Sequence, residues 1–278
     1  MSGNDFDEVI KNEVKESFRK IAKSFCNCNH KYLYKYQSFN SNYIDNVINT
    51  IDKNYIFLSK LAFFEKDDIH EYQLVKQYFI DSLKALIDQY NESIIRDVTK
   101  IICLSYEYPN DYLIRNYSKK FGFVVKYDAN KLKNYIAHRF NRKIIFGDVT
   151  YVDNKSEFIA RQYNDTFSKY SNKLALGIQA GDDYIFSKIS HDVINDMSYF
   201  LNSTNFLIKD NRFRCEKEFR FVFTNFDENE EYIFLGKNEV IKEIIILDSS
   251  ISLLDKNKMY KLIDVCKKHN IKYRIEIL

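Results

Sequence analysis

The sequence predicts an α+β protein whose mixed, mainly antiparallel sheet carries helical insertions and ends in a β-α-β unit. Short apolar segments with strand propensity alternate along the chain with segments whose apolar residues recur every three or four positions, as in helices. At the end of the chain, a strand at 240–247, a helix at 252–269 and a strand at 271–277 make one crossover unit. No low-complexity linker or internal repeat divides the chain. We therefore expect one α+β domain over residues 31–278, preceded by an N-terminal amphipathic helix within residues 1–30.

The predicted elements before residue 152 are short and follow each other closely. Helical spacing of apolar residues is found at about 5–25, 43–51, 68–90, 111–120 and 128–139. Strand propensity is found at 32–36, 55–59, 101–105, 121–127 and 143–152. Ser38, Asn40 and Ser41 offer caps for the second of these helices. The order predicts strands and helices joined by short connections.

The second half of the chain is expected to begin with helices. From 155 to 205 the apolar spacing is helical but is interrupted at Gly177 and Gly181, which predicts two or three helices. An acidic turn then separates a strand at 215–223 from a strand at 232–235. We expect these two strands to form a hairpin.

The strand at 215–223 holds the candidate catalytic residues. With a period of two, the odd-numbered residues, including three phenylalanines, form a core face. The other face carries Glu216, Glu218 and Arg220. Two carboxylates roughly 7 Å apart raise each other's pKa on a partly buried face, whereas the guanidinium favours their charged forms. A solvated edge strand with a surface ion pair would show the same pattern.

Composition and charge exclude few classes of protein. The net charge of +3 is too small to indicate a nucleic-acid-binding protein. No apolar run approaches the roughly 20 residues of a membrane span, and the polar, acidic first residues do not resemble a secretory signal. Five cysteines, an odd and scattered set, are typical of reduced thiols in a cytosol. We therefore expect a cytoplasmic protein without membrane contact.

One short segment has the spacing of metal ligands. Cys26, Cys28 and His30 form a Cys-x-Cys-x-His sequence, but a structural zinc site has four ligands and no second pair lies nearby in the sequence. A Gly-rich phosphate loop is not indicated either, since the spacing of Gly177 and Gly181 lacks a following Lys. We therefore expect no metal.

Six short segments, in order along the chain, resemble a widespread, largely bacterial domain family of unknown function. The segments similar to its LYKYRS, VxY and EKEWR motifs are 33–38, 149–151 and 216–220. The segments similar to its LYFSS, CFS and HYADNHKGF motifs are 56–59, 103–105 and 116–123. The chain departs from the family at Gln37, where the family has Arg, and at 63–68, where the FNDPFD loop of the family is missing.

The same layout distantly resembles mono-ADP-ribosyltransferases. These enzymes carry a polar residue on a first strand, a serine on a second strand and a glutamate, often within Glu-x-Glu, on a later strand. The resemblance implies that NAD is the substrate, with Glu218 as the catalytic carboxylate and Glu216 as its partner toward the acceptor. The cofactor-binding residues that it implies are Lys35, Tyr36, Ser59 and Arg220.

The function that this resemblance implies is ADP-ribosyl transfer or NAD glycohydrolysis, in a bacterial toxin or phage-defence effector. Two other classes explain the same residues. A non-catalytic sensor module of a defence system would bind a protein or a nucleotide through a surface rich in tyrosine, of which the chain has 22. A nuclease would hold Mg²⁺ with Asp210, Glu216 and Glu218, but a period of two turns Lys217 to the opposite face from both glutamates.

Overall fold

A computed structural model of the chain describes residues 29–60, 72–81, 99–140, 144–178, 204–223, 231–236, 239–248 and 256–278, together with isolated positions between residues 12 and 26, between 84 and 91, and at 201. The chain divides into two compact units. The first holds residues 1–27, 64–97 and 149–212, and the second holds residues 28–63, 98–148 and 213–278. The expected single domain over residues 31–278 stays a prediction.

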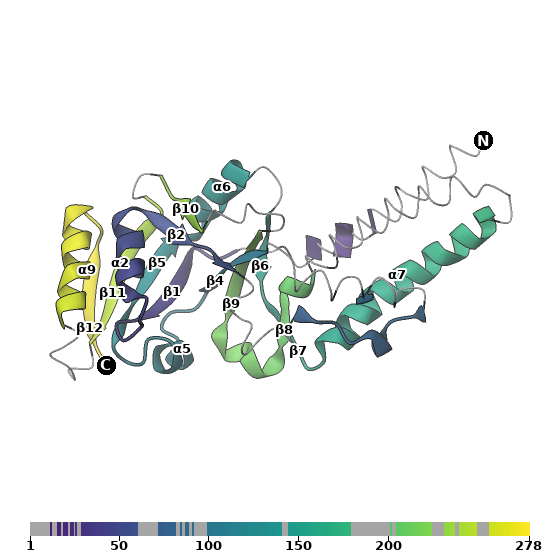
Figure 1. Cartoon of the computed structure of the whole chain (residues 1–278), viewed down its shortest axis with the longest axis horizontal. Helices are drawn as coiled ribbons and strands as arrows, with labels where there is room; N and C mark the ends of the chain where they lie inside the picture. The colour runs from purple at the N-terminus through teal and green to yellow at the C-terminus, as the bar shows by residue number, and fades with distance from the viewer. Residues whose placement is uncertain are drawn as a thin grey trace. The chain divides into compact units, whose positions relative to one another are not determined.

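Within the described residues, the second unit contains an eight-stranded sheet (Figure 1). Its strands run in the order β12, β11, β5, β1, β4, β9, β6, and β3 pairs with β4. They are β1 (Tyr32–Ser38), β3 (Ser59–Lys60), β4 (Lys100–Ser105), β5 (Gly122–Asp128), β6 (Ile144–Asp148), β9 (Glu218–Phe223), β11 (Ile241–Asp248) and β12 (Tyr273–Ile277). Its strand pairs are antiparallel except β11 with β12. This confirms the α+β class with a mixed, mainly antiparallel sheet.

Three described helices cover one face of this sheet. They are α2 (Ile44–Asp52), α6 (Ala129–Phe140) and α9 (Lys256–Lys268). Alternate residues of the strands, such as Leu33 on β1 and Phe219 and Phe221 on β9, are fully buried in the core beneath these helices. The core face that alternation predicted for the three phenylalanines of 215–223 is therefore confirmed in β9.

The opposite face of the sheet is covered in part by a short helix, α5 (Asp111–Asn116). Leu113 and Ile114 of this helix pack against apolar residues of β5 and β11, namely Val124, Ile245 and Leu247. Tyr34 and Tyr108 pack at the border of this smaller core. Beside it, alternation places Ser105 of β4 and Glu218 and Arg220 of β9 on this same face, since Leu104, Phe219 and Phe221 lie in the other core.

Gly122 begins β5 where that strand approaches β1 very closely. A Cβ atom added to Gly122 would lie 2.0 Å from the carbonyl oxygen of Gln37, which no side chain can tolerate. The two strands pair along their whole length, from Tyr32 opposite Asp128 to Ser38 opposite Gly122. Glycine is therefore required at the start of β5 for this register.

The predicted C-terminal β-α-β unit is confirmed. β11, α9 and β12 follow one another, and β11 pairs with β12 in parallel, with Ile244 opposite Tyr273. The helix buries one face against the sheet through Met259, Leu262, Ile263, Val265 and Cys266. A parallel pair needs such a crossover helix, so the sequence pattern of the tail identified both strands.

Two predicted strands are wrong in their extent, and the predicted hairpin is wrong. The strand expected at 215–223 begins only at Glu218, because residues 211–216 form a 3₁₀ helix, η3 (Asn211–Glu216). The strand expected at 143–152 consists of two strands, β6 and β7 (Thr150–Val152). β10 (Tyr232–Phe234) pairs with β2 (Tyr55–Phe57) and not with β9, which lies between β4 and β6.

In the first unit, α7 (Lys155–Ile178) follows β7, which pairs in parallel with β8 (Ile208–Asp210). The helix predicted at 68–90 is not continuous, because residues 73–75 are not helical and a short 3₁₀ helix, η2 (Lys76–Tyr78), follows them. The helix predicted at 5–25 and the helices predicted after residue 178 lie almost wholly outside the described residues. In the part of the chain that the structure describes, no helix is both long and apolar enough to cross a membrane.

Candidate functional site

The candidate site lies where β1 and β4 stop pairing. Whereas β1 pairs with β5 along its length, it pairs with β4 only through Tyr34 opposite Ser105. Beyond this pair the Lys35 ammonium donates a hydrogen bond to the backbone carbonyl of Cys103 at 2.8 Å. A side chain thus bridges the two strands where their main chains no longer pair, at the opening between β1 and β4.

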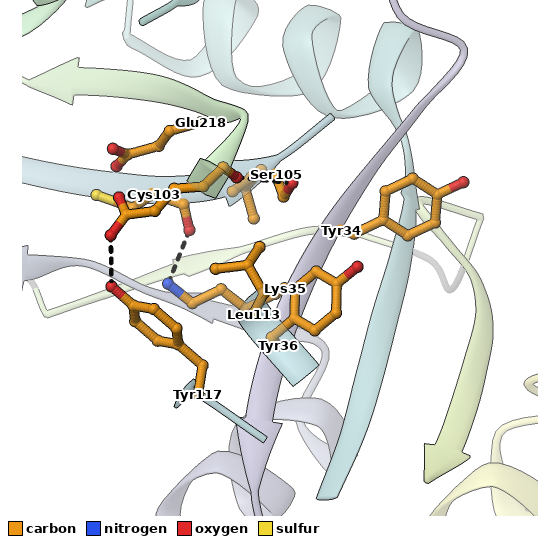
Figure 2. Close-up of a pocket in the computed structure, with 10 residues that line it drawn as sticks. Tyr34, Lys35, Tyr36, Cys103, Ser105, Leu113, Tyr117 and Glu218 are labelled. Carbon is orange, nitrogen blue, oxygen red and sulfur yellow. Dashed lines mark hydrogen bonds between the residues drawn. The ribbon is translucent and has the colours of Figure 1, made fainter. Parts of the chain in front are cut away.

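A pocket of about 80 Å³ occupies this opening (Figure 2). It is lined by Tyr34, Lys35, Tyr36, Cys103, Leu104, Ser105, Leu113, Tyr117, Glu216 and Glu218. Pockets for drug-sized ligands measure roughly 300–1,000 Å³. The enclosed part of this pocket therefore admits one ring or a similar small group, and the rest of a larger ligand would lie outside it.

Glu218 enters the pocket as one half of a buried ion pair. Its Oε1 accepts from Nε of Arg220 and its Oε2 from Nη2 of Arg220, both at 2.9 Å. The two residues are only 5% and 1% exposed, respectively. A bidentate guanidinium favours the ionised carboxylate and fixes its orientation. The pair therefore presents an oriented anion to the pocket, which Glu218 lines.

Glu216 reaches the same pocket from the end of η3. Its Oε1 accepts a hydrogen bond from the hydroxyl of Tyr117 at 3.0 Å, and the residue is 6% exposed. Burial, and then the negative charge of Glu216, raise the pKa of Tyr117 well above its usual range. Tyr117 therefore stays a neutral hydrogen-bond donor. Figure 2 shows the Tyr117 hydroxyl directed at this carboxylate, across the pocket from Tyr34.

A tight turn between the two glutamates directs both into the pocket. Lys217 has a φ of 48°, in the left-handed region that non-glycine residues rarely adopt. The hydroxyl of Ser105 lies 3.0 Å from the carbonyl oxygen of Glu216 and 3.2 Å from that of Lys217, and it accepts from the backbone N–H of Glu107. Ser105 thereby holds the turn against the end of β4.

The loop after β4 closes the pocket on the side of Tyr36. The Tyr36 hydroxyl donates to the carbonyl oxygen of Glu107 at 2.9 Å, and the ring of Tyr108 stacks on that of Tyr34 at 5.4 Å. Asn110 ties the loop to η3, because its side-chain amide donates to the carbonyl oxygen of Cys215 at 2.8 Å. Burial, and then the neighbouring Tyr108, raise the pKa of Tyr36, so its phenol stays protonated.

Cys103 lies beside the Glu218 carboxylate. Burial, and then the negative charge of Glu218, raise the pKa of its thiol well above the usual value. A thiol that stays protonated is a poor nucleophile. We therefore assign Cys103 no covalent role.

The structure brings together four of the six residues predicted for the site. Glu216, Glu218, Lys35 and Tyr36 line the pocket, and Arg220 lies behind Glu218 as its partner. Ser59 does not line the pocket; it lies in β3 opposite Ile101 of β4. The structure adds pocket residues that the sequence prediction left out, chiefly Tyr34, Ser105 and Tyr117. Ser105 and Tyr117 both lie in segments that resemble family motifs, which is the signal that could have identified them.

The nuclease hypothesis finds no support in the site. Asp210 is not among the residues that line the pocket. Across the described ranges, no group of three or more His, Cys, Asp or Glu side chains is arranged to hold a metal ion.

The pocket combines two carboxylates, one ammonium group and several hydroxyl groups with tyrosine rings. Carboxylates accept hydrogen bonds from hydroxyl groups, and tyrosine rings stack on planar groups. The chemistry suits a planar ring attached to a hydroxyl-bearing sugar. Comparisons of the chain with protein-family models, with curated proteins and with solved structures found no match.

Proposed function

We propose that the pocket binds the nicotinamide riboside end of NAD and that Glu218 promotes cleavage of the bond between ribose and nicotinamide. The observation that supports this best is the meeting of Lys35, Tyr36, Glu216 and Glu218 around one small pocket. They come from two distant parts of the chain, Lys35 with Tyr36 and Glu216 with Glu218. The resemblance to mono-ADP-ribosyltransferases implied each of them independently of any structure.

The proposed chemistry uses the anion of Glu218. When the glycosidic C–N bond breaks, its electron pair leaves with nicotinamide, which becomes neutral, and positive charge develops on the ribose. A fixed carboxylate that accepts a hydrogen bond from a ribose hydroxyl stabilises this charge. Arg220 keeps the carboxylate oriented through two hydrogen bonds.

Glu216 is placed for the second half of the reaction. The ribosyl cation is captured by water or by a nucleophile of an acceptor, which loses a proton as the new bond forms. Glu216 would accept that proton, and it lies in the same pocket as Glu218 with one oxygen bonded to Tyr117. Water as the nucleophile gives NAD glycohydrolysis, and a protein or nucleotide acceptor gives ADP-ribosyl transfer.

The size of the pocket limits which part of NAD can enter it. About 80 Å³ holds a single ring, so only the nicotinamide enters the opening between β1 and β4, among the side chains of Tyr34, Tyr36 and Tyr117. The adenosine half would lie outside the enclosed volume. Binding through one ring and one sugar predicts weak affinity for fragments such as adenosine.

The alternative is a sensor module that binds a nucleotide or a protein without chemistry. It is favoured by the fact that both carboxylates already have protein partners, Arg220 for Glu218 and Tyr117 for Glu216. A ligand must compete with or add to these bonds. Binding of NAD without release of nicotinamide would support this alternative.

The test is release of nicotinamide from NAD by the purified protein and by two glutamine variants. Glu218→Gln should lower the rate by at least about 100-fold, the effect of removing one group that stabilises transition-state charge. Glu243→Gln is the matched control, because Glu243 is equally buried, at 3% exposed, and ion-paired but does not line the pocket. Its rate should be unchanged.

Loss of the fold is checked separately. Glu218→Gln leaves Arg220 buried without its anion, so the double variant Glu218→Gln/Arg220→Gln, which carries neither charge, should be more stable and equally inactive. Nicotinamide release that persists in Glu218→Gln, or wild-type protein that neither binds nor cleaves NAD, would refute the proposal. In bacteria, the wild type but not Glu218→Gln should deplete cellular NAD if the protein is a toxin or defence effector.

A further inference from the structure

β12 forms one end of the eight-stranded sheet, and its outer edge pairs with no strand in the described part of the chain. Its inner edge pairs with β11. The N–H of Ile244 donates to the carbonyl of Lys272, and the N–H of Leu278 donates to the carbonyl of Asp248. The even-numbered residues of this strand therefore direct their backbone groups toward β11.

Alternation along a strand fixes where the remaining groups point. Because successive residues direct their N–H and C=O groups to opposite sides, those of Tyr273, Ile275 and Ile277 point to the open edge. A row of such donors and acceptors is a template for another strand. Two apolar side chains accompany it, since Ile275 is 48% exposed and Ile277 is 85% exposed.

The sequence of β12 is complementary to itself in one antiparallel register. When Ile275 lies opposite Ile275 of a second copy, each Arg274 faces the Glu276 of the other copy, and each Tyr273 faces an Ile277. Opposite charges then meet on one face of the sheet and apolar side chains on the other, and both kinds of cross-strand pair are stabilising. Ile275 has its backbone groups at the open edge, so it can exchange two hydrogen bonds with its counterpart.

The neighbouring registers place like charges opposite each other. Centring the pair on Arg274 opposes two guanidinium groups, and centring it on Glu276 opposes two carboxylates. Centring it on Tyr273 places Lys272 opposite Arg274. Registers centred between residues are excluded, because they would oppose an outward-pointing backbone group with an inward-pointing one. Among the registers centred on residues 273 to 276, the charge pattern thus selects the one centred on Ile275. Centring the pair on Ile277 opposes no like charges but leaves only residues 276–278 to pair.

Arg274 and Glu276 are already ordered by contacts within a single copy of the chain. Arg274 Nη1 lies 2.8 Å from Oε1 of Glu243, and Arg274 Nε donates to Oε1 of Glu276 at 2.8 Å. The Tyr108 hydroxyl donates to the other oxygen of Glu276. These contacts order both side chains, so little side-chain entropy is lost when a second copy adds its own charges.

We propose that two copies of this chain pair through β12, in the antiparallel register centred on Ile275, and so join their sheets into one. The interface is isologous, as a two-fold axis requires, because the same strand serves both copies. A strand of five residues buries little area, so the dimer should dissociate on dilution, with a dissociation constant on the order of micromolar. The proposal is independent of NAD chemistry.

Cysteine cross-linking tests the register. In a background with Cys26, Cys28 and Cys215 changed to Ser, Ile275→Cys should form a disulfide-linked dimer under mild oxidation, because directly opposite Cα atoms lie about 5.5 Å apart. Ile277→Cys is the matched control. Ile277 is more exposed than Ile275, but in the proposed register the two Cα atoms at position 277 would lie more than roughly 13 Å apart. Ile277→Cys should therefore form no disulfide-linked dimer. Equal cross-linking at both positions, or at neither, would overturn the register.

Sedimentation velocity over a wide range of concentration tests the association itself. The wild type should shift from monomer to dimer as its concentration rises. Ile275→Lys places two ammonium groups opposite each other on a side chain that is already half exposed, so it should fold normally and remain monomeric. A wild type that stays monomeric at every concentration would refute self-pairing, as expected if β12 instead receives a strand from another protein.

Discussion

The buried pair of Glu218 and Arg220 makes a demanding prediction about stability. Arg220 is 1% exposed, and its two hydrogen bonds to Glu218 are both 2.9 Å long. Arg220→Met keeps most of the volume of the side chain but removes the guanidinium. The carboxylate of Glu218 is then left in a buried position without its cation, where solvation by water cannot replace the lost partner.

The size of the effect follows from the geometry. At a separation near 3 Å and an effective dielectric constant of about 20, the attraction between unit charges is roughly 5–6 kcal/mol. Measured losses on removing one partner of a buried pair are about 3–5 kcal/mol. We therefore expect Arg220→Met to lower the free energy of unfolding by about 3–5 kcal/mol, out of a total of roughly 5–15 kcal/mol for a domain.

Urea denaturation at pH 7, followed by circular dichroism, measures this loss. The cycle comprises the wild type, Arg220→Met, Glu218→Gln and the double variant Glu218→Gln/Arg220→Met. The stability lost in the double variant should be about 2 kcal/mol smaller than the sum of the two single losses. A loss below about 1 kcal/mol for Arg220→Met, or strict additivity, would refute a buried, coupled pair. The carboxylate that the proposed reaction requires would then have no fixed orientation.

Two further predictions concern residues outside the pocket. Gly122→Ala places a methyl group 2.0 Å from the carbonyl oxygen of Gln37, so β1 and β5 must separate. The free energy of unfolding should fall by about 2–3 kcal/mol in the same urea experiment. A neutral effect would contradict the register of β1 with β5. Burial opposes ionisation of Glu243, but Arg274 and Lys126 outweigh it and hold the pKa of this carboxyl below its ordinary value of 4.5. A lowered pKa contributes stability that is fully present above pH 4.5 and disappears as the pH falls through the folded-state value. The difference in stability between the wild type and Glu243→Gln should therefore shrink as the pH falls below 4.5 and not stay constant.

Sequence patterns predicted those parts of the fold in which local alternation and burial agree. β1, β4, β5 and the C-terminal β-α-β unit were all located to within a few residues, because their apolar residues lie in cores on one or both faces of the sheet. The three phenylalanines of β9 show this most clearly: each is at most 1% exposed. The spacing of apolar residues in the sequence shows which strand residues are buried, but it does not show which strand is the pairing partner.

The errors occur where pairing partners or single backbone angles decide the structure. The pattern of Cys215 and Lys217 continues that of β9, but Lys217 adopts a φ of 48° and the strand starts after it. The hairpin between 215–223 and 232–235 fails because β10 pairs with β2, which lies far away in the sequence. A single sequence contains no signal for such a long-range choice.

The site was predicted in part through a coincidence of geometry. Period-two alternation placed Glu216 and Glu218 on one face, and the left-handed turn at Lys217, which breaks that alternation, still leaves both in one pocket. Ser59 and Ser105 each end an apolar segment that resembles a family motif, so the motifs identify both serines as candidates but do not choose between them. The pairing of Ser105 with Tyr34 and with Glu218 decides between them.

Lys35 supplies the ammonium group among the residues that line the pocket. Its register opposite Val125 directs it toward the apolar side of the sheet, where an ammonium group without a partner is unfavourable. Its bond to the Cys103 carbonyl supplies that partner and joins β1 to β4. Together with Arg220 it balances the two glutamates in charge. A neutral set of charges with both anions on the pocket side does not favour a simple anion such as phosphate, and it is compatible with the nicotinamide riboside of the proposed function.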